Sequence, residues 1–182
     1  LFIQKPEVIP MEICIFEDIY YDRLEPLIYS RPAYDLVCGM NMLREKIARA
    51  YPGVRVSMHT RPYLDQFLKN KYPDITVNSI EDDHCLFVNG RMLAPHNLSE
   101  LIPIKDTTNK LYMSGDQIAA AMVSGDKLKE IKLHITDLLS LANFDGLTIE
   151  QTEINFVDYC WDLIKYNGTE LLHDQNYIME QD

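Results

Sequence analysis

Residues 11–90 alternate between strand-like and helix-like patterns, and this alternation limits the fold more than any other feature of the sequence. Short runs rich in β-branched and aromatic residues predict strands, and two stretches with apolar residues on one helical face predict helices. Parallel strands need long crossover connections, which are usually helices. We therefore expect an α/β fold, with a mostly parallel or mixed sheet flanked by helices. The expected strands span residues 11–17, 54–60, 75–80 and 84–90, and the expected helices span residues 41–50, with Asn41 as the N-cap, and 61–71.

The second half of the chain is less regular. A hairpin is expected where the runs KLYM and QIAAAMV flank the turn residues 114–116. A C-terminal helical segment should begin near Phe156, break at Asn167-Gly168 and continue as a second short helix. The other expected elements are a helical turn at 97–103, a helix from about Asp137 and a strand at 147–154.

The length of 182 residues suits one compact domain, or one domain with a short appendage. Hydrophobic residues make up 47% of the chain and charged residues 25%, which is enough apolar material for a core and too much for a disordered chain. We expect residues 1–10 to be a leader or extension, residues 11–155 to form the α/β domain, and residues 156–182 to form a helical linker or docking segment.

The formal charge is −11, from 28 acidic and 17 basic residues. Such an acidic excess argues against nonspecific binding of nucleic acids or of anionic membranes. The charge is unevenly distributed, because residues 148–182 hold eight acids and one base, whereas all seven arginines lie between Arg23 and Arg91. A local cationic pocket for a nucleotide is therefore compatible with this acidic chain.

The four cysteines, Cys14, Cys38, Cys85 and Cys160, are widely spaced and form no zinc-binding pattern. Three of them lie in apolar runs, which favours buried reduced thiols and a cytoplasmic location. No apolar stretch reaches the length of a transmembrane helix. His59, at the end of the second strand, could line a cleft, although a lone histidine at a strand end more often has a structural role.

Residues 23–46 form a proline-containing loop that leads into a helix and is rich in cations. Arginine offers paired donors to phosphate, and the start of a helix offers free N–H groups. Gly39 closes the loop, so the segment predicts a phosphate site. In the alternative interpretation, Arg31 pairs with Asp35 and only pins the loop. The cations of this segment are Arg23, Arg31, Arg44 and Lys46.

Polar residues follow the first and last strands of the alternating segment. Glu17 and Asp18 end the first strand, and Asn89, Gly90 and Arg91 end the run FVNGRML. Open α/β sheets bind ligands at the carboxyl ends of their strands, and glycine allows close approach of a backbone. Asp18 could hold a metal or a ribose there, or it could belong to an acidic pair that merely caps a strand. Asn89, Gly90 and Arg91 could equally form a plain turn in which the arginine is exposed to solvent.

The motifs ICIFED, PLIYSRPAYDLVCGMNMLREKI and LFVNGRML together resemble the N-terminal part of a divergent sugar nucleotidyltransferase family over residues 11–93. That family is similar to the pyrophosphorylase half of the bifunctional UDP-N-acetylglucosamine pyrophosphorylase/glucosamine-1-phosphate acetyltransferase. Near the end, YCWDLIKYNGTELLHDQ resembles the helical segment that joins this domain to a left-handed β-helix acyltransferase. The resemblance implies a Rossmann-like nucleotidyltransferase fold, with a nucleoside triphosphate and a sugar 1-phosphate as substrates and Mg²⁺ as cofactor. It is compatible with a homo-oligomer.

The sequence departs from that family at three places. The segment EDIYYDRLEP stands where the family has a glycine-rich loop with a G-x-G-T-R core. The phosphate-binding lysine of the family is absent, and Arg31 is the nearby cation that could replace it. Arg91 follows Gly90 where the family has a magnesium-binding aspartate. Arginine can neutralise part of a phosphate's charge but cannot hold Mg²⁺, which puts catalysis in question and leaves the expected fold unchanged.

Three hypotheses follow. The first is an enzyme that transfers a nucleotidyl group from a nucleoside triphosphate to a sugar 1-phosphate and releases pyrophosphate. The second is a noncatalytic module of the same fold, used for assembly or ligand sensing, and the third is a stand-alone acidic interaction domain. Under the first, the expected site residues are the catalytic phosphate clamps Arg31 and Arg91, the nucleotide- or substrate-binding residues Arg23, Gly39, Asn89 and Gly90, and the metal ligand Asp18.

Overall fold

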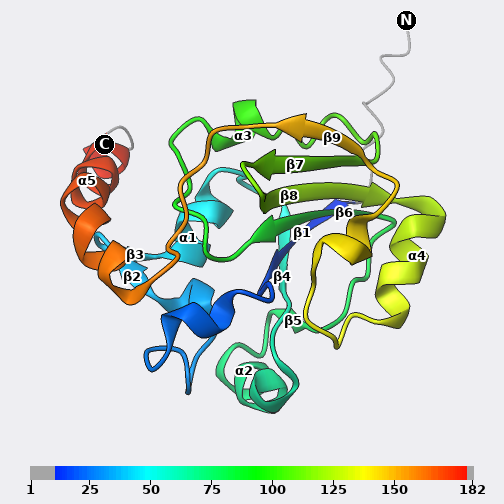
Figure 1. Ribbon diagram of the computed structural model, residues 1–182, viewed down its shortest axis with the longest axis horizontal. Helices are drawn as coiled ribbons and strands as arrows, with labels where there is room; N and C mark the ends of the chain where they lie inside the picture. Colours follow the sequence, from blue (N-terminus) through cyan, green and yellow to red (C-terminus); the bar gives the residue numbers. More distant parts are fainter. Residues whose placement is uncertain (1–10, 180–182) are drawn as a thin grey trace, which may run out of the picture.

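The computed structural model describes residues 11–179, which form one seven-stranded sheet with helices packed on both faces (Figure 1). The strands of this sheet are β1 (Met11–Phe16), β4 (Arg55–Met58), β5 (Thr76–Val77), β6 (His84–Asn89), β7 (Lys110–Ser114), β8 (Gln117–Ser124) and β9 (Thr148–Gln151). Their order is β5-β4-β1-β6-β8-β7-β9. The strands from β5 to β6 are parallel, β8 is antiparallel to both of its neighbours, and β9 runs parallel to β7. The expected mixed α/β sheet is therefore confirmed, and the expected leader at residues 1–10 lies outside the described residues.

The helices connect the strands and, at the end of the chain, pack beside them. They are α1 (Leu43–Arg49), α2 (Asp65–Lys71), α3 (Leu98–Leu101), α4 (Gly125–Leu133) and α5 (Cys160–Met179). A short ribbon of β2 (Val37–Cys38) and β3 (Asn41–Met42) precedes α1, so Asn41 is a strand residue and not the expected N-cap. Figure 1 shows α5 beside this ribbon and α1, at the side of the molecule opposite α4. Turns of 3-10 helix lie at Tyr21–Leu24, Ala33–Asp35, Pro62–Leu64 and Leu141–Phe144.

Both faces of the sheet are buried, and this explains the continuous apolar sequences of β1 and β6. Successive side chains of a strand point to opposite faces. Ile13 and Ile15 therefore pack in one cluster with Ile47 of α1, while Phe16 packs in a second cluster with Leu128 of α4. The central parallel strands are held between two helical layers, and only their ends are available to ligands.

The expected helix from about Asp137 is wrong, because the helix of this region is α4 and it ends at Leu133. Helix α4 was not expected, since only Leu128 and Ile131 of its nine residues are buried and the others are mostly charged or polar. Beyond it the chain turns over residues 134–137, and Leu139 then forms a parallel bridge with Asp18. This pairing next to the end of β1 holds the segment out of a helix.

The C-terminal helix begins later than expected and does not break. Phe156 forms an antiparallel bridge with Met92, and α5 starts at Cys160. The helix then continues through Asn167 and Gly168, although an interior glycine costs about 1 kcal/mol relative to alanine. Tertiary contacts offset this cost. Oδ1 of Asn167 accepts a hydrogen bond from the backbone N–H of Gly39 at 2.9 Å, and α5 also forms ion pairs with α1.

The expectations for the hairpin, the helical turn and the cysteines are confirmed. The segments β7 and β8 form the expected antiparallel hairpin, and the expected turn at 97–103 contains α3. Cys14, Cys38 and Cys85 are buried, Cys160 is half-buried, and none of them is in a disulfide. Among the helices of residues 11–179, none is both long and apolar enough to cross a membrane.

Candidate functional site

The carboxyl ends of β1, β4 and β6 lie at one edge of the sheet, because these strands are parallel neighbours. The loop after β1 begins with Glu17 and Asp18, and β6 ends at Asn89, followed by Gly90 and Arg91. Ligands of open α/β sheets bind at this kind of edge. The structure thus brings four predicted site residues, Asp18, Asn89, Gly90 and Arg91, close to one another.

Asp18 and Arg91 form a buried ion pair at this edge. Nη2 of Arg91 lies 2.6 Å from Oδ2 of Asp18, and Nε lies 2.9 Å from Oδ1. Nδ2 of Asn89 donates to the same Oδ2 at 2.9 Å. Asp18 is 4% exposed and Arg91 is 0% exposed. Both carboxylate oxygens of Asp18 are therefore satisfied inside the protein by charged or amide donors.

The remaining N–H groups of Arg91 also have internal acceptors. Nη1 donates to Oδ1 of Asp158 at 2.8 Å and to the carbonyl oxygen of Val157 at 3.3 Å, and Nη2 donates to Oε1 of Gln117 at 2.7 Å. Burial lowers the pKa of Arg91, but the hydrogen bonds and charges of Asp18 and Asp158 outweigh burial and raise it. Arg91 is a permanent buried cation, and its role as a phosphate clamp stays a prediction.

The residues at this edge do not fit a Mg²⁺ site. Mg²⁺ is usually held by one or two carboxylates together with substrate phosphates. The predicted ligand Asp18 accepts from Arg91 through both oxygens, and the guanidinium places positive charge beside them. Within residues 11–179, no group of three or more His, Cys, Asp and Glu side chains is arranged to hold a metal ion.

A second buried ion pair ties down the loop after β1. Nε of Arg61 lies 3.2 Å from Oε2 of Glu17, which also accepts from Oγ1 of Thr60 at 2.8 Å. The other oxygen of Glu17 accepts the backbone N–H of Ala33 at 3.0 Å, and Nη2 of Arg61 donates to the carbonyl oxygen of Arg31 at 2.9 Å. This loop, which stands where the resembling family has its glycine-rich loop, is fixed to the end of β4 by side chains.

Arg31 differs from the other predicted cations because its side chain is exposed. The guanidinium forms no hydrogen bond or ion pair with any residue in 11–179, and only the backbone of Arg31 is hydrogen-bonded. It lines an open cavity of about 460 Å³, together with Lys71 and the rings of Tyr29, Tyr63 and Phe67. Arginine beside exposed aromatic rings can bind phosphate and stack on planar groups. Arg31 is therefore the predicted phosphate clamp whose side chain is available to a ligand.

Asp35 is bound by cations other than Arg31. Oδ1 of Asp35 accepts from Nε of Arg44 at 2.7 Å, and Oδ2 accepts from Nζ of Lys71 at 3.0 Å. The alternative pairing of Arg31 with Asp35 is thus not formed. The hydrogen bond and charge of Asp35 raise the pKa of Arg44 and outweigh the effect of burial, which lowers it. Arg44, not Arg31, pins this loop.

Arg23 lies at the half-exposed rim of the edge. Its guanidinium is 4.2 Å from the ring centroid of Tyr20, and Nη1 is 3.9 Å from Oδ1 of Asp158. Its predicted contact with a nucleotide stays a prediction.

The two predicted glycines are both required by close packing. A Cβ on Gly90 would lie 2.7 Å from Cδ1 of Tyr34 and 3.1 Å from the carbonyl oxygen of Phe16. Gly39 has a φ of +81°, and a Cβ there would lie 2.5 Å from Oδ2 of Asp174 on α5. Gly39 thus lets α5 approach the β2–β3 ribbon, which is a structural reason for a glycine at that position.

The N-terminal half and the C-terminal helix meet through buried charges. Nζ of Lys46 on α1 lies 2.6 Å from Oε2 of Glu170 and 2.9 Å from Oδ2 of Asp174. Nη1 of Arg49 donates to Oδ1 of Asp174 at 2.6 Å. Burial raises the pKa of Asp174, but hydrogen bonds from Lys46, the N–H of Met40 and Arg49 outweigh burial and lower it. Part of the acid excess of the C-terminal segment therefore neutralises cations of α1.

His59 has the structural environment that a lone histidine at a strand end suggests. It is fully buried, and its Nε2 lies 2.9 Å from the carbonyl oxygen of Asp137. Burial lowers its pKa to about 4, so the ring is neutral near pH 7.

Three side chains of the edge were not among the predicted residues. Arg61 follows β4, so the rule that parallel strands share a carboxyl edge could have found it. Gln117 and Asp158 come from β8 and from the segment before α5, and no sequence pattern points them toward Arg91.

Solved structures of nucleotidyltransferases share this fold. The chain is similar to the inositol-1-phosphate CTP transferase from T. maritima, with 11% identity, a TM-score of 0.53, and coverage of 88% of this chain and 96% of that chain. It is similar to the CTP:phosphocholine cytidylyltransferase from Streptococcus pneumoniae, with 15% identity, a TM-score of 0.50 and coverage of 88% and 99%. A third similar structure is a Bacillus anthracis protein assigned as a glucose-1-phosphate thymidylyltransferase, with 10% identity, a TM-score of 0.54 and coverage of 88% and 95%. At these identities the likeness shows the fold.

The sequence itself gives the family. No curated protein matches the chain. The profile described as sugar nucleotidyl transferase matches residues 13–182, which is nearly the whole chain. Together with the fold, this match supports a nucleotidyltransferase-like function. The chain belongs to the sugar nucleotidyl transferase family.

Proposed function

We propose that this chain is a noncatalytic nucleotidyltransferase-like module that senses a phosphate-bearing ligand of the family's substrate class. The observation that carries the proposal is the buried pair of Asp18 and Arg91, which occupies the edge where a metal-bound nucleotide would react. The ligand class follows from the family: a nucleoside triphosphate, a sugar 1-phosphate, or the sugar nucleotide that they form.

Nucleotidyl transfer depends on positioning the reacting phosphate and neutralising its charge. For Arg91 to serve a phosphate, it would have to leave Asp18, its partner at 2.6 Å. Removing one partner of a buried pair costs about 3–5 kcal/mol, because the other charge remains in a site shielded from water. That cost opposes catalysis at this edge and favours a fixed structural role for the pair.

The cavity at Arg31 supports ligand binding without metal chemistry. Arg31 and Lys71 offer cationic donors, and the rings of Tyr29, Tyr63 and Phe67 are exposed beside them. Charge-assisted hydrogen bonds from arginine to phosphate oxygens are strong and directional. A nucleotide or sugar phosphate would place its phosphate on Arg31 and its base or sugar against the aromatic rings.

The second candidate is the catalytic transfer itself, and family membership favours it. In this candidate, UTP or another nucleoside triphosphate reacts with N-acetylglucosamine 1-phosphate or a related sugar phosphate in the cytoplasm. Arg31 then binds phosphate, Asn89 and Gly90 border the base or sugar, and the chain is the N-terminal part of a longer protein with a β-helix acyltransferase. The residues at the edge do not fit Mg²⁺, so no step through the metal is derived.

A pyrophosphate-release assay separates the two candidates. The purified chain is incubated with UTP or dTTP, with several sugar 1-phosphates, and with or without Mg²⁺. The noncatalytic module should release no pyrophosphate above the protein-free reaction, while calorimetry should detect nucleotide or sugar-phosphate binding that does not require the metal. Turnover that requires Mg²⁺ would refute the proposal and establish the enzyme.

A matched pair of variants tests the ligand site. Arg31→Ala should abolish the calorimetric signal of UTP binding without changing the urea midpoint, because this side chain forms no hydrogen bond or ion pair within the described residues. Lys129→Ala removes an exposed cation on α4, far from the Arg31 cavity, and should keep wild-type binding. Unchanged affinity in Arg31→Ala would contradict the phosphate-clamp role.

A further inference from the structure

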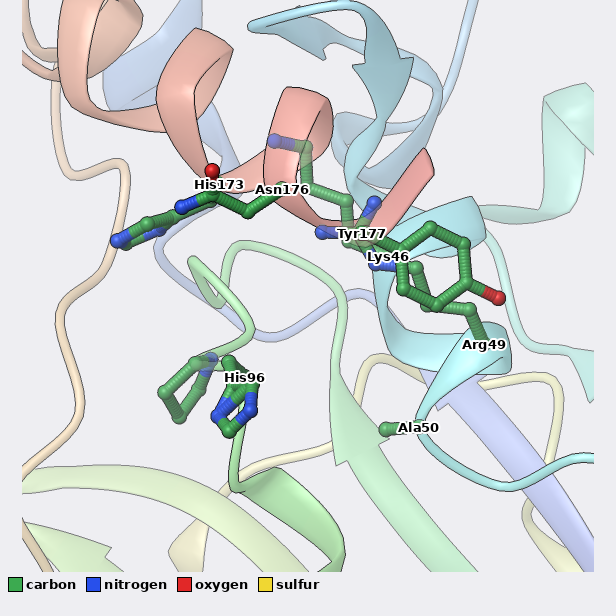
Figure 2. A pocket seen from close by; sticks show the side chains of 8 residues that line it. Lys46, Arg49, Ala50, His96, His173, Asn176 and Tyr177 are labelled. Atoms are coloured by element: carbon green, nitrogen blue, oxygen red, sulfur yellow. The ribbon is translucent and has the colours of Figure 1, made fainter. Parts of the chain in front are cut away.

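A second cavity, of about 440 Å³, lies between α1, α5 and the loop that follows β6 (Figure 2). It shares no lining residue with the edge that holds Asp18 and Arg91, or with the cavity at Arg31. Its volume is within the range of sites that bind small metabolites. The polar side chains that line it are Lys46, Arg49, His96, His173, Asn176 and Tyr177.

The lining is rich in N–H donors and contains no carboxylate. Glu170 and Asp174 border the cavity without lining it: they hold the amino group of Lys46 at 2.6 Å and 2.9 Å, and Oε1 of Glu170 lies 3.3 Å from Nδ1 of His173. The side chain of Lys46 is fully buried, and its third N–H has no acceptor within residues 11–179. A buried donor without an acceptor is costly, and an anion in the cavity would satisfy it.

Arg49 adds a second cation with unused donors. Its Nη1 donates to Asp174 at 2.6 Å, and its guanidinium lies 4.6 Å from the ring centroid of Tyr177. Its Nε and Nη2 have no acceptor in the described part of the chain. Figure 2 shows His96 across the cavity from His173 and Tyr177, so the donors surround the space from several elements.

We propose that this cavity binds a small phosphate monoester, at a site separate from the function proposed above. The phosphate accepts hydrogen bonds from Lys46 and Arg49. The phosphate oxygens can also exchange hydrogen bonds with the imidazole rings of His96 and His173, which line the cavity. The amide of Asn176 then faces the hydroxyl groups of the ligand.

The position of this site couples binding to the docking of the last helix. One wall is α1, the first crossover helix, and the opposite wall is α5. A ligand that touches both walls binds only the folded, docked arrangement. It therefore raises the stability of the protein in proportion to the logarithm of its concentration above Kd.

Calorimetry and thermal unfolding with glucose 1-phosphate and inorganic phosphate test the proposal, with glucose as the uncharged probe. We expect saturable binding and a rise in Tm with glucose 1-phosphate and none with glucose. The double variant His96→Ala/His173→Ala should bind about tenfold more weakly, because two hydrogen-bonding groups are lost. The matched control His134→Ala removes an exposed imidazole after α4, and it should keep wild-type affinity.

The same data can overturn the proposal. No saturable binding up to about 1 mM, or wild-type affinity in the double variant, would reject the site. Loss of glucose 1-phosphate binding in Arg31→Ala, with the histidine variants unaffected, would assign the ligand to the other cavity. If the double variant fails to fold, His96→Ala alone replaces it, since this exposed loop residue should weaken binding about threefold, and an unchanged affinity would refute the proposal.

Discussion

Replacing Asp18 by asparagine should destabilise the protein strongly, because Arg91 keeps its charge in a site that water does not reach. The substitution preserves shape but removes the carboxylate that accepts from Nε and Nη2 of Arg91 at 2.9 Å and 2.6 Å. Asp158 remains 2.8 Å from Nη1, and its side chain is 30% exposed, so part of the compensation survives. Removing one partner of a buried pair costs about 3–5 kcal/mol, and the remaining carboxylate of Asp158 places the expected loss at about 3 kcal/mol.

Urea unfolding, monitored by circular dichroism, measures the change in the free energy of unfolding in a double-mutant cycle. The single variants Asp18→Asn and Arg91→Met each leave one buried charge without its partner, whereas the double variant leaves neither. The double variant should therefore lose less stability than the two single losses added together, with a coupling of about 2 kcal/mol. The expected loss for Asp18→Asn corresponds to a fall in Tm of about 6–12 °C for a domain of this size.

Asp126→Asn, at an exposed pair on α4, serves as the control and should leave the urea midpoint unchanged. A loss below about 1 kcal/mol for Asp18→Asn, or additive effects, would refute the account of this edge.

Three further predictions concern other parts of the fold. Gly39→Ala should cost about 2–4 kcal/mol, because the new Cβ would meet α5 and the residue has a positive φ, whereas Gly53→Ala, with a φ of +78° and open space around it, should cost about 1 kcal/mol. Equal losses in urea titrations would show that the helix contact does not matter. Lys46→Met should cost about 3 kcal/mol, because Glu170 and Asp174 stay buried without the ammonium group of Lys46. In the same urea titration, the double variant Lys46→Met/Glu170→Gln should recover part of that loss. The pKa of His59 falls from 6.5 unfolded to about 4 folded, so the unfolded state gains the proton first as the pH falls. The stability from neutral His59 is complete above pH 6.5 and decreases by about 3 kcal/mol between pH 6.5 and pH 4. His59→Gln should lack this decrease in urea midpoints measured across that range, and an unchanged slope would contradict it.

The central strands could be predicted from the sequence because their burial follows their apolar pattern. β1 and β6 are buried on both faces, so most of their residues are apolar and form short continuous runs. Helix α4 could not be predicted in the same way, since its contact with the core depends on Leu128 and Ile131 alone. The expected break at Gly168 was wrong because local helix propensity does not include the contacts that α5 makes with α1 and the β2–β3 ribbon.

The location of the candidate site could be predicted, but its internal chemistry could not. The ends of β1 and β6 give the positions of Asp18 and Arg91, since parallel neighbours share an edge. Whether Arg91 faces a ligand or a carboxylate depends on side chains from distant segments, among them Gln117 and Asp158. Those segments reach Arg91 only through the antiparallel half of the sheet and the approach to α5, and this tertiary arrangement leaves no periodic signal in the sequence.

The ion pairs between α1 and α5 have a consequence for the order in which the protein folds as it is made. Lys46 leaves the ribosome 124 residues before its partner Glu170. At about 5–20 residues per second, the lysine spends on the order of ten seconds without that carboxylate. During this interval its ammonium must stay hydrated, because burial without a counter-charge is unfavourable. The first crossover helix therefore completes its packing only when the last helix has been synthesised, and C-terminal truncation would leave the early part of the domain unable to close.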